Sequence, residues 1–474
     1  MPLVSVQRPF ETTRWAPFRC APSVRSAKKA RTWLASLGRF RKEAGVKKER
    51  PTTQLTVKTI LNQVQHFAGF VYRSVRLVGT ERRPRIEVYI EPHAQSQACC
   101  GECQKVCAGY DRLPERRWAF VPLWAIPVDL YYAPRRVSCP EHGVVVEHLP
   151  WNEGKRPISR AMMGFLALWA RRLSWRETAR AFGVSWEAVY RSVGWFVAWG
   201  LAHRTLGGVE AIGVDEIHWG KGQRSANFLT VIYQIDAACH RLLWVGPRRT
   251  QASLRRGLKV LGPEVVSRLR FVCSDMWKPY LNVIARQAGQ ALHVLDRFHI
   301  TLHLNQAVDK VRRSEMARLH GDGRAKHLKK MRWKLLRRRS RMRGRARQQI
   351  AVLVLSKLAT GKAWLLKEVF QHLWHYRSPL WAQAFLHGWC AHAMRSRLEP
   401  MKKIARMLRA HEPLLLNWFR AKGEISNGVV EGLNNKIRVV TRRSYGFRTY
   451  PAMEVALYHA LGRLPEPEFT HRFC

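Results

Sequence analysis

The feature that most constrains the fold is the order of short apolar segments between residues 209 and 300. Three of them, VEAIGVDEIHW, NFLTVIYQID and RLLWVGPRR, are patterned as strands, and two more, LRFVCSD and HVLDRFHI, follow the helical segment ASLRRGLKVLG. Three antiparallel strands, a helix and two further strands are the order of a ribonuclease-H-like α/β core. We predict that this core spans 206–302 and resumes at 410–465, after a helical basic insertion over 303–409.

The chain ahead of this core is expected to form three further parts. Residues 1–54 carry scattered Pro, many basic residues and no sustained apolar period, which is typical of a flexible basic arm. Residues 55–152 begin with a helical pattern and continue with strand-like segments, and 153–205 are mainly helical. We predict a zinc-ribbon domain at 55–152 and a helix-turn-helix domain at 153–205.

Charge limits the choice of partner. The chain has 83 Lys and Arg against 33 Asp and Glu, a formal net charge of +50, so we expect a polyanion, and specifically nucleic acid. No segment approaches the roughly 20 uninterrupted apolar residues of a membrane-spanning helix, and the N-terminus lacks the apolar stretch of a secretory signal. These observations predict a cytoplasmic protein with no membrane partner.

Positive charge is densest in the middle of the predicted insertion. Residues 324–347 hold thirteen Lys or Arg and no acid. Such a run repels itself unless phosphates neutralise it, although a solvated charged face is the alternative. Within it, Arg337, Arg338 and Arg339 are candidate DNA contacts.

The spacing of cysteines indicates a metal site. Five of the ten cysteines lie in one short part of the chain. Cys100 with Cys103, and Cys139 with His142, have the two-residue spacing of short loops that turn two side chains onto one zinc ion, about 2.3 Å from each sulfur. We predict one structural zinc ion on these four residues. The alternatives are free buried thiols or a first pair that uses Cys99 or Cys107.

A helix-turn-helix pattern covers residues 174–196, SWRETARAFGVSWEAVYRSVGWF. Ala179 is small where the two helices would touch, Gly183 falls in the turn, and Ser185 would cap the second helix. An ordinary helical hairpin is the alternative. The side chains expected to face outward, as on a helix that reads a DNA groove, are Trp186, Glu187, Tyr190 and Arg191.

Acids are scarce in this cationic chain, so those at the ends of predicted strands are conspicuous. Asp215 lies in the first core strand and Asp275 ends the fourth. Two carboxylates on neighbouring strands repel each other unless divalent cations lie between them. A third acid, Glu431, lies in SNGVVEGLNNKIRVVTRR, where Ser426 can cap a helix. The helical face with Glu431 would also carry Asn427, Asn435 and Arg438.

Together the three acids would hold two Mg²⁺ or Mn²⁺ ions. Two such ions clamp the attacking and the leaving oxygen of an in-line displacement at phosphorus. Asp215 would bridge the ions, Asp275 would complete one and Glu431 the other. The flanking phosphates would be held by Lys436, Arg438, Arg442 and Arg443.

At these residues the chain resembles the DDE transposases of bacterial insertion sequences, and among them the ISL-three family, from about residue 55 to 465. The resemblance lies in the cysteine and histidine ribbon, the helix-turn-helix pattern, VDEIHWGKG with VCSDMWKPY and LDRFHI, and SNGVVEGLNNKIRVVTRRSYGFR. The last stretch is the most specific, because its Ser-Asn-Gly, Glu-Gly and Asn-Asn groups followed by Tyr-Gly-Phe-Arg are characteristic of the family.

The resemblance implies a catalytic triad on Asp215, Asp275 and Glu431 and an enzyme that cleaves double-stranded DNA and transfers its strands. It also implies that the zinc and helix-turn-helix regions recognise terminal inverted repeats, that a homodimer or larger assembly forms on DNA, and that the protein is associated with the bacterial nucleoid. The rival interpretations are a catalytically silent, transposase-derived DNA-binding regulator and a related metal-dependent DNA nuclease.

The chain departs from the family pattern in three respects. His142 stands where the family commonly has a cysteine, and the first 50 residues match nothing recognisable. Glu216 and Asp296 are alternative carboxylates. We expect both to support the metal site without binding the ions, because adjacent strand residues point to opposite faces of a sheet and Asp296 follows the strand pair that usually supplies the ligands.

Overall fold

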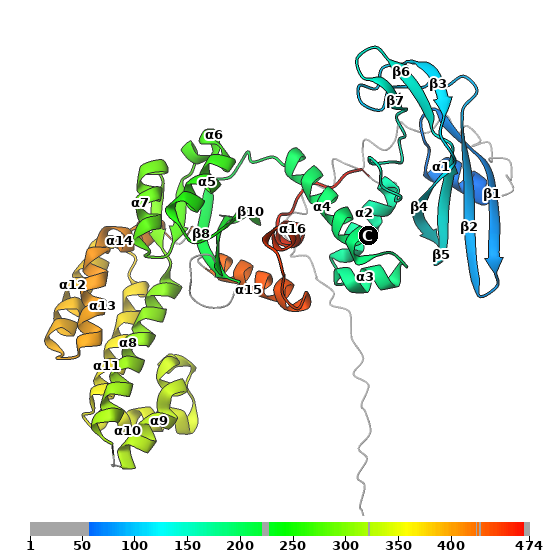
Figure 1. The fold of residues 1–474 in the computed structure, drawn as a ribbon. Coiled ribbons are helices and arrows are strands. Elements are labelled where there is room, and N and C mark those ends of the chain that lie inside the picture. The colour runs from blue at the N-terminus through cyan, green and yellow to red at the C-terminus, as the bar shows by residue number, and fades with distance from the viewer. Residues whose placement is uncertain (1–55, 220–226, 321–322, 423, 426–427, 469–474) are drawn as a thin grey trace, which may run out of the picture. The chain divides into compact units, whose positions relative to one another are not determined.

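The described part of the chain covers most of its length. The structure is a computed structural model that describes residues 56–219, 227–320, 323–422, 424–425 and 428–468 (Figure 1). The predicted basic arm, the proposed cap Ser426 and its neighbour Asn427 lie outside these residues.

One helix and two small sheets form the N-terminal part. α1 (Val57–Val64) is followed by a four-stranded sheet in the order β1-β2-β5-β4 and a three-stranded antiparallel sheet in the order β3-β6-β7. The strands are β1 (Phe70–Thr80), β2 (Arg83–Pro92), β3 (Ala108–Arg112), β4 (Arg116–Leu123), β5 (Ile126–Tyr132), β6 (Arg135–Cys139) and β7 (Gly143–Val146). Trp151 packs within 6 Å of the rings of Phe70, Trp118 and Tyr132, which makes it the centre of this core.

Three helices follow, and their ends are set by serine caps. They are α2 (Arg160–Ala170), α3 (Trp175–Ala181) and α4 (Trp186–His203). Ser174 and Glu177 form a reciprocal capping box at the start of α3. The Ser185 hydroxyl accepts a hydrogen bond from the Ala188 N–H at 3.1 Å, which confirms the predicted cap of α4. Gly183, with φ of +63°, makes the turn between α3 and α4.

A five-stranded mixed sheet forms the central part, in the order β10-β9-β8-β11-β12. Its strands are β8 (Ala211–His218), β9 (Phe228–Asp236), β10 (Cys239–Pro247), β11 (Phe271–Ser274) and β12 (Leu292–Leu295). β8, β9 and β10 are antiparallel, whereas β11 runs parallel to β8 and β12. The predicted five strands are confirmed in order, and a helix that the sequence analysis did not separate, α7 (Lys278–Gln287), joins β11 to β12.

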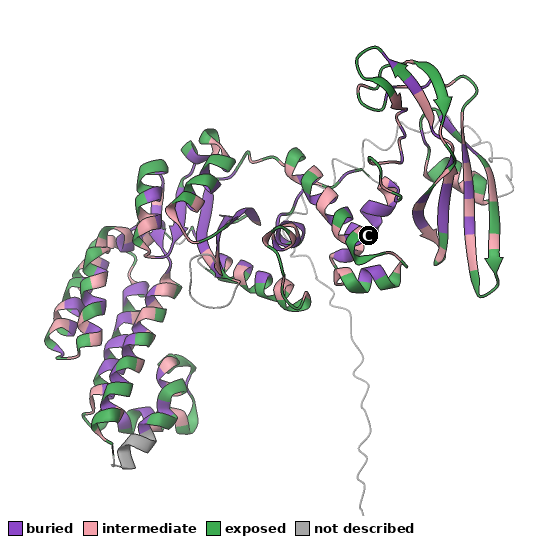
Figure 2. Cartoon of the chain, viewed as in Figure 1, coloured by how far each residue is buried: buried purple, intermediate pink, exposed green. Residues whose placement is uncertain are grey.

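Helices cover both faces of this sheet (Figure 1). α5 (Gln251–Leu261) and α7 pack on one face, next to the short α6 (Pro263–Ser267), and α15 (Gly428–Arg443) and α16 (Tyr450–Leu461) pack on the other. Alternation along β8 separates the two interfaces: Val214 joins the cluster of α5 and α7, and Ile217 joins that of α15. The strands are therefore buried along most of their length (Figure 2).

The remaining helices have a hydrophobic core of their own. They are α8 (Arg297–Arg318), α9 (Gly323–Leu336), α10 (Gly344–Leu355), α11 (Ala359–Phe370), α12 (Pro379–Arg395), α13 (Glu399–Ala410) and α14 (Glu412–Arg420). The helical part thus begins before and ends after the predicted 303–409. Among the described residues no single helix is long and apolar enough to span a membrane, and only the bent pair Gly344–Leu355 and Ala359–His375 reaches that length and composition together.

Gly213 allows α15 to lie close against β8. A Cβ added at this position would be 2.6 Å from Cγ2 of Val430 on α15 and 3.2 Å from Cγ2 of Ile235 on β9. Both neighbours are β-branched side chains with restricted rotamers, so they cannot easily move aside. The glycine therefore sets the separation between this helix and the sheet.

We expect Gly213→Ala to lower the free energy of unfolding by about 1–3 kcal/mol, because the added methyl group overpacks the interface between helix and sheet. Gly432→Ala on α15, where an added Cβ meets nothing within 4 Å, is the matched control and should leave stability unchanged or slightly raised. Urea denaturation of both variants measures the difference. Equal effects would contradict the proposed role of Gly213.

Candidate active site and metal centre

Three buried aspartates lie at one edge of the central sheet. Asp215 is in β8, Asp275 directly follows β11, and Asp296 directly follows β12. Because β11 runs parallel to both β8 and β12, the carboxyl ends of these strands meet at the same edge. The exposed fractions are 7% for Asp215, 8% for Asp275 and 7% for Asp296. The structure thus places two of the predicted catalytic acids at one edge of the sheet, with Asp296 beside them.

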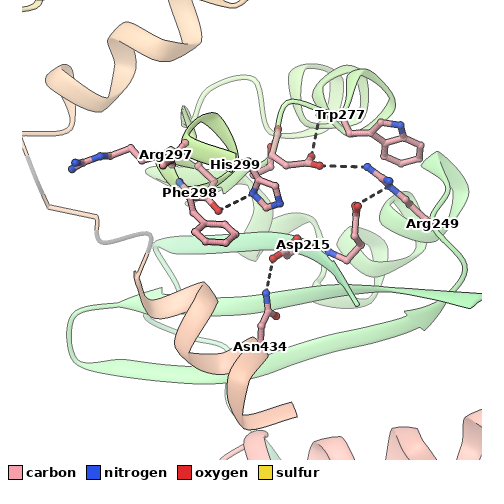
Figure 3. A network of polar contacts seen from close by, with 12 residues as sticks. Asp215, Arg249, Trp277, Arg297, Phe298, His299 and Asn434 are labelled. Carbon is pink, nitrogen blue, oxygen red and sulfur yellow. Dashed lines mark hydrogen bonds and ion pairs between the residues drawn. The ribbon is translucent and has the colours of Figure 1, made fainter. Parts of the chain in front are cut away.

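Asp215 is held by a side chain from α15. The Nδ2 of Asn434 donates to Oδ2 of Asp215 at 2.6 Å (Figure 3), and the backbone N–H of Glu216 donates to Oδ1 at 2.7 Å. The hydroxyl of Tyr233 donates to Oδ1 of Asn434 at 2.7 Å, which fixes the orientation of the amide. Burial raises the pKa of Asp215 above its usual value.

Arg249 connects Asp275 to Glu216. Its guanidinium lies 2.8 Å from Oε2 of Glu216 and 3.4 Å from Oδ2 of Asp275, and it stacks over the ring of Trp277 at 4.3 Å (Figure 3). The backbone N–H of Trp277 donates to the other Asp275 oxygen at 3.0 Å. Burial, and then the charge of Asp275, raise the pKa of Glu216 to about 8 despite Arg249. Glu216 and Asp275 are therefore bridged by Arg249.

Asp296 caps α8 and holds a histidine at the same edge. The Phe298 N–H donates to Oδ1 of Asp296 at 2.8 Å, and Nδ1 of His299 lies 3.0 Å from Oδ2. Burial alone lowers the pKa of His299, but the hydrogen bond with Asp296 and the charges of Asp215 and Asp275 raise it to about 9. His299 is thus a cation at neutral pH beside the aspartates.

Glu431 lies in the first turn of α15, one helical turn before Asn434. Its side chain is exposed, and within the described residues it forms no hydrogen bond or ion pair. The sequence analysis placed Asn435 on its face of the helix, but Asn434 is the residue that reaches Asp215, whereas Asn435 is exposed and accepts a hydrogen bond from Arg438 at 2.9 Å. The structure therefore places Glu431 on the helix that touches Asp215 without joining its carboxylate to the aspartates.

Sequence reasoning missed three residues of this edge: Asn434, Arg249 and His299. The sequence did contain a signal for His299. A histidine that follows a helix-capping aspartate by three residues lies on the same side of the helix, so its ring can contact the aspartate. Arg249 carried no signal, since it lies among many arginines. Asn434 is next to Asn435, and only the exact rotation of the helix decides which of the two side chains faces the sheet.

The four predicted zinc ligands come together in the N-terminal part. The ligand atoms of Cys100, Cys103, Cys139 and His142 all lie within 4.8 Å of one another. Sγ of Cys103 is 3.8 Å from Sγ of Cys139, and Nδ1 of His142 is 3.5 Å from Sγ of Cys139. Bonds of about 2.3 Å in a tetrahedron separate two sulfurs by about 3.8 Å, so the group fits one zinc ion. The hydrogen bond from His142 lowers the pKa of Cys139 to about 6, which favours the thiolate that binds metal.

The competing cysteines lie outside the group of four, although the thiol of Cys107 interacts with that of Cys139. Sγ of Cys99 lies 3.9 Å from the carbonyl oxygen of Gln97, and Sγ of Cys107 lies 3.3 Å from that of Lys105. Neither belongs to the group of four. The geometry thus favours Cys100 with Cys103 as the first pair.

The candidate groove-reading residues lie at the start of α4. Trp186 is exposed by 59% and its ring lies 6.4 Å from that of Tyr190, which also packs 5.2 Å from Trp175. Arg191 is exposed and pairs with Glu187 at 2.6 Å. An aromatic surface with one arginine is therefore available at this helix end.

All of the candidate phosphate-binding residues are exposed. Six of them, just after α9 and along α15, are Arg337, Arg338, Arg339, Lys436, Arg438 and Arg442. Arg443 differs, because its guanidinium donates to the backbone carbonyls of Arg171 at 2.9 Å and Arg172 at 3.3 Å, at the end of α2. The sequence analysis did not foresee this structural contact for Arg443.

Comparison with known proteins identifies the class and the family. A model of the DDE enzymes of the ISL3 (ISL-three) type, described as a transposase, matches residues 212–457, which include Asp215, Asp275 and Glu431. The transposase for insertion sequence element IS1001 of Bordetella parapertussis is 25% identical over 366 residues, 77% of this chain and 88% of that protein. The transposase for IS1557 of Mycobacterium tuberculosis is 25% identical over 397 residues, 78% and 87% respectively. The chain is a transposase. It belongs to the ISL3 family of DDE transposases.

The zinc ligands generate the first prediction for this site. Purified protein should contain about one zinc ion per chain, and Cys139→Ser should remove it, because three ligands of a structural site hold the ion far more weakly than four. Zinc content measured by mass spectrometry tests this. Cys99→Ser is the control and should keep the ion; loss of zinc from that variant would contradict the assignment.

The two adjacent asparagines of α15 allow a second prediction for this site. Asn434→Ala should lower the free energy of unfolding by about 1–3 kcal/mol, because it removes the hydrogen bonds that Asn434 makes with Oδ2 of Asp215 and with the Tyr233 hydroxyl in a buried place. Asn435→Ala, which removes only an exposed hydrogen bond, should change it by less than about 0.5 kcal/mol. Denaturant unfolding monitored by tryptophan fluorescence separates the two. A similar loss in both variants would argue against the Asp215 contact.

Proposed function

We propose that this transposase binds the terminal inverted repeats of a bacterial insertion sequence and cuts and rejoins DNA at their ends. The observation that carries the proposal is the pair of buried aspartates, Asp215 and Asp275, at one sheet edge beside the helix that bears Glu431. The net charge of +50 supplies the attraction to DNA. The IS1001 and IS1557 proteins are transposases for insertion sequences, which supports the same role here.

Asp215, Asp275 and Glu431 would hold two Mg²⁺ or Mn²⁺ ions. Carboxylate oxygens are the hard ligands that these ions prefer, and two buried aspartates at one edge favour a cation between them. Two such ions would stabilise the attacking and the leaving oxygen of an in-line displacement at phosphorus. The exposed position of Glu431 suits a ligand that engages when DNA lies on α15.

The neighbouring residues would keep the aspartates in place. Asn434 orients Asp215 through its 2.6 Å hydrogen bond, and the Trp277 N–H and Arg249 orient Asp275. Before metal ions bind, His299 adds positive charge beside them, which lowers the repulsion among the carboxylates. In this arrangement Glu216 and Asp296 would support the site. Water or a 3′-hydroxyl would attack the phosphorus and form a new P–O bond, while the bond from phosphorus to the 3′-oxygen of the cleaved strand breaks and that oxygen leaves as a 3′-hydroxyl.

Several exposed surfaces would bind the DNA. α3 and α4 would act as a helix-turn-helix, with Trp186, Tyr190 and Arg191 at the groove. The flanking phosphates would be held by Lys436, Arg438, Arg442, Arg337, Arg338 and Arg339. We propose three domains: a zinc ribbon at 55–152, a helix-turn-helix at 153–205, and a ribonuclease-H-like core at 206–302 and 410–465 that flanks the helical insertion. The protein would act as a dimer or larger assembly on paired element ends.

The test is cleavage of a labelled duplex taken from the DNA that flanks the gene, with Mg²⁺ present. We expect breaks at fixed positions that Asp275→Ala and Glu431→Gln each reduce at least about a thousandfold, because several kcal/mol of transition-state stabilisation depend on the metal site. Glu424→Gln, which changes an exposed glutamate paired with Arg270, is the control and should cut normally.

Each other outcome has a defined meaning. Tight binding of the ends without cleavage by any form would favour a DNA-binding regulator. Cleavage that shows no preference for the ends would favour a general metal-dependent nuclease. Full activity of Glu431→Gln would remove Glu431 from the proposed triad.

A further inference from the structure

The turn after α15 carries an unusually exposed aromatic side chain. Tyr445 is 100% exposed, so it packs against no described residue. Its φ is +54°, a left-handed conformation that disfavours residues other than glycine, and Gly446 follows with φ of +90°. The backbone of Tyr445 is therefore strained, although its ring is not buried.

Hydrogen bonds fix this turn at the end of α15. The N–H of Tyr445 donates to the carbonyl of Arg442 at 3.0 Å, and the N–H of Gly446 donates to the carbonyl of Thr441 at 2.9 Å. These bonds satisfy carbonyls at the helix end that would otherwise lack partners. The exposed ring is therefore carried by an ordered backbone.

Contacts on either side of Tyr445 attach the turn to the helices that precede the central sheet. Arg443 donates to carbonyls at the end of α2, and the ring of Phe447 lies 6.2 Å from that of Trp175 on α3. Trp175 in turn packs against Tyr190 of α4. The turn therefore joins two elements to which we assign DNA contacts, α15 and the start of α4.

The charge around the ring defines the chemistry of its partner. Arg442 and Arg448 are exposed on either side of Tyr445, and both suit phosphates. An aromatic ring between arginines matches the alternation of base and phosphate in a nucleic acid strand. In an intact duplex the faces of the bases are covered by their neighbours, so a ring can stack only on a base that has left the stack or been separated from it.

We propose that Tyr445 stacks on a DNA base displaced from the duplex stack near the element end. This rests on the proposed function, since it requires DNA along α15. From Glu431 to Arg443 the helix rises about 18 Å at 1.5 Å per residue, which corresponds to about five base steps of 3.4 Å. The displaced base should therefore lie about five steps from the cleaved bond.

The experiment uses the full chain with Asp275→Ala as a background that does not cut. It is bound to end duplexes that carry single thymines at successive positions. Permanganate oxidises a thymine through a face that no neighbour covers, so it detects a thymine that has left the duplex stack even when Tyr445 covers its other face. One thymine should become reactive in the complex. Tyr445→Ala should abolish that reactivity and weaken binding about fivefold or more, the loss expected for one base stack.

Two further variants sharpen the result. Tyr445→Phe keeps the ring without the hydroxyl and should retain the reactive thymine. Trp381→Ala removes a different exposed aromatic ring, 68% exposed on α12, to which no DNA contact is assigned, and should leave the pattern unchanged. An unchanged pattern in Tyr445→Ala, loss of the reactive thymine in Tyr445→Phe, or no reactive thymine with the Tyr445 side chain present would each overturn the proposal.

The two proposals fail in different ways. If the natural protein cleaves the end duplex with Mg²⁺ but no thymine becomes reactive, only the role of Tyr445 is wrong. If the natural protein neither binds the ends selectively nor cuts them, the proposed function is wrong.

Discussion

The contact between α15 and β8 determines how the acidic edge is built. Asn434 donates to Asp215 at 2.6 Å, and Gly213 lets Val430 approach the strand where any larger residue would push the helix away. Both contacts act on the same strand, two residues apart. The position of Glu431 relative to the sheet depends on them, because it lies on the same helix within one turn of Asn434 and Val430.

The same edge concentrates negative charge in a protein that is otherwise strongly positive. Asp215, Asp275 and Asp296 meet where the strands end, and the described cations among them are Arg249 and His299. Glu216 lies beside them, and its raised pKa of about 8 favours the protonated carboxyl at neutral pH. Each carboxylate also accepts hydrogen bonds or an ion pair. A buried group of acids is expensive unless such partners or metal ions compensate it, so the local polar network is a condition for keeping the acids together.

The sequence pattern predicted the strands, the helix cap and the zinc ligands, which depend on residues close together in the chain. It missed site residues whose contacts depend on the exact rotation of a helix or on residues far apart in the chain. Alternation gave the five strands in order, Ser185 was found as a cap from its place before an apolar helix, and two-residue spacing selected Cys100, Cys103, Cys139 and His142. Asn434 was missed because an error of one residue in helix phase exchanges it with Asn435. Arg249 was missed because its partners come from two other strands, which no local pattern reveals.

The bond between Asp215 and Asn434 joins residues 219 positions apart in the chain. During synthesis the N-terminal parts leave the ribosome first and can fold while the rest is still being made. α15 completes the acidic edge only when nearly the whole chain has emerged. A product that ends before α15 would keep the proposed helix-turn-helix at α3 and α4 but lack the bond from Asn434 to Asp215 and the proposed ligand Glu431. Under the proposed function, interrupted translation would yield competitors for the element ends and not unregulated nucleases.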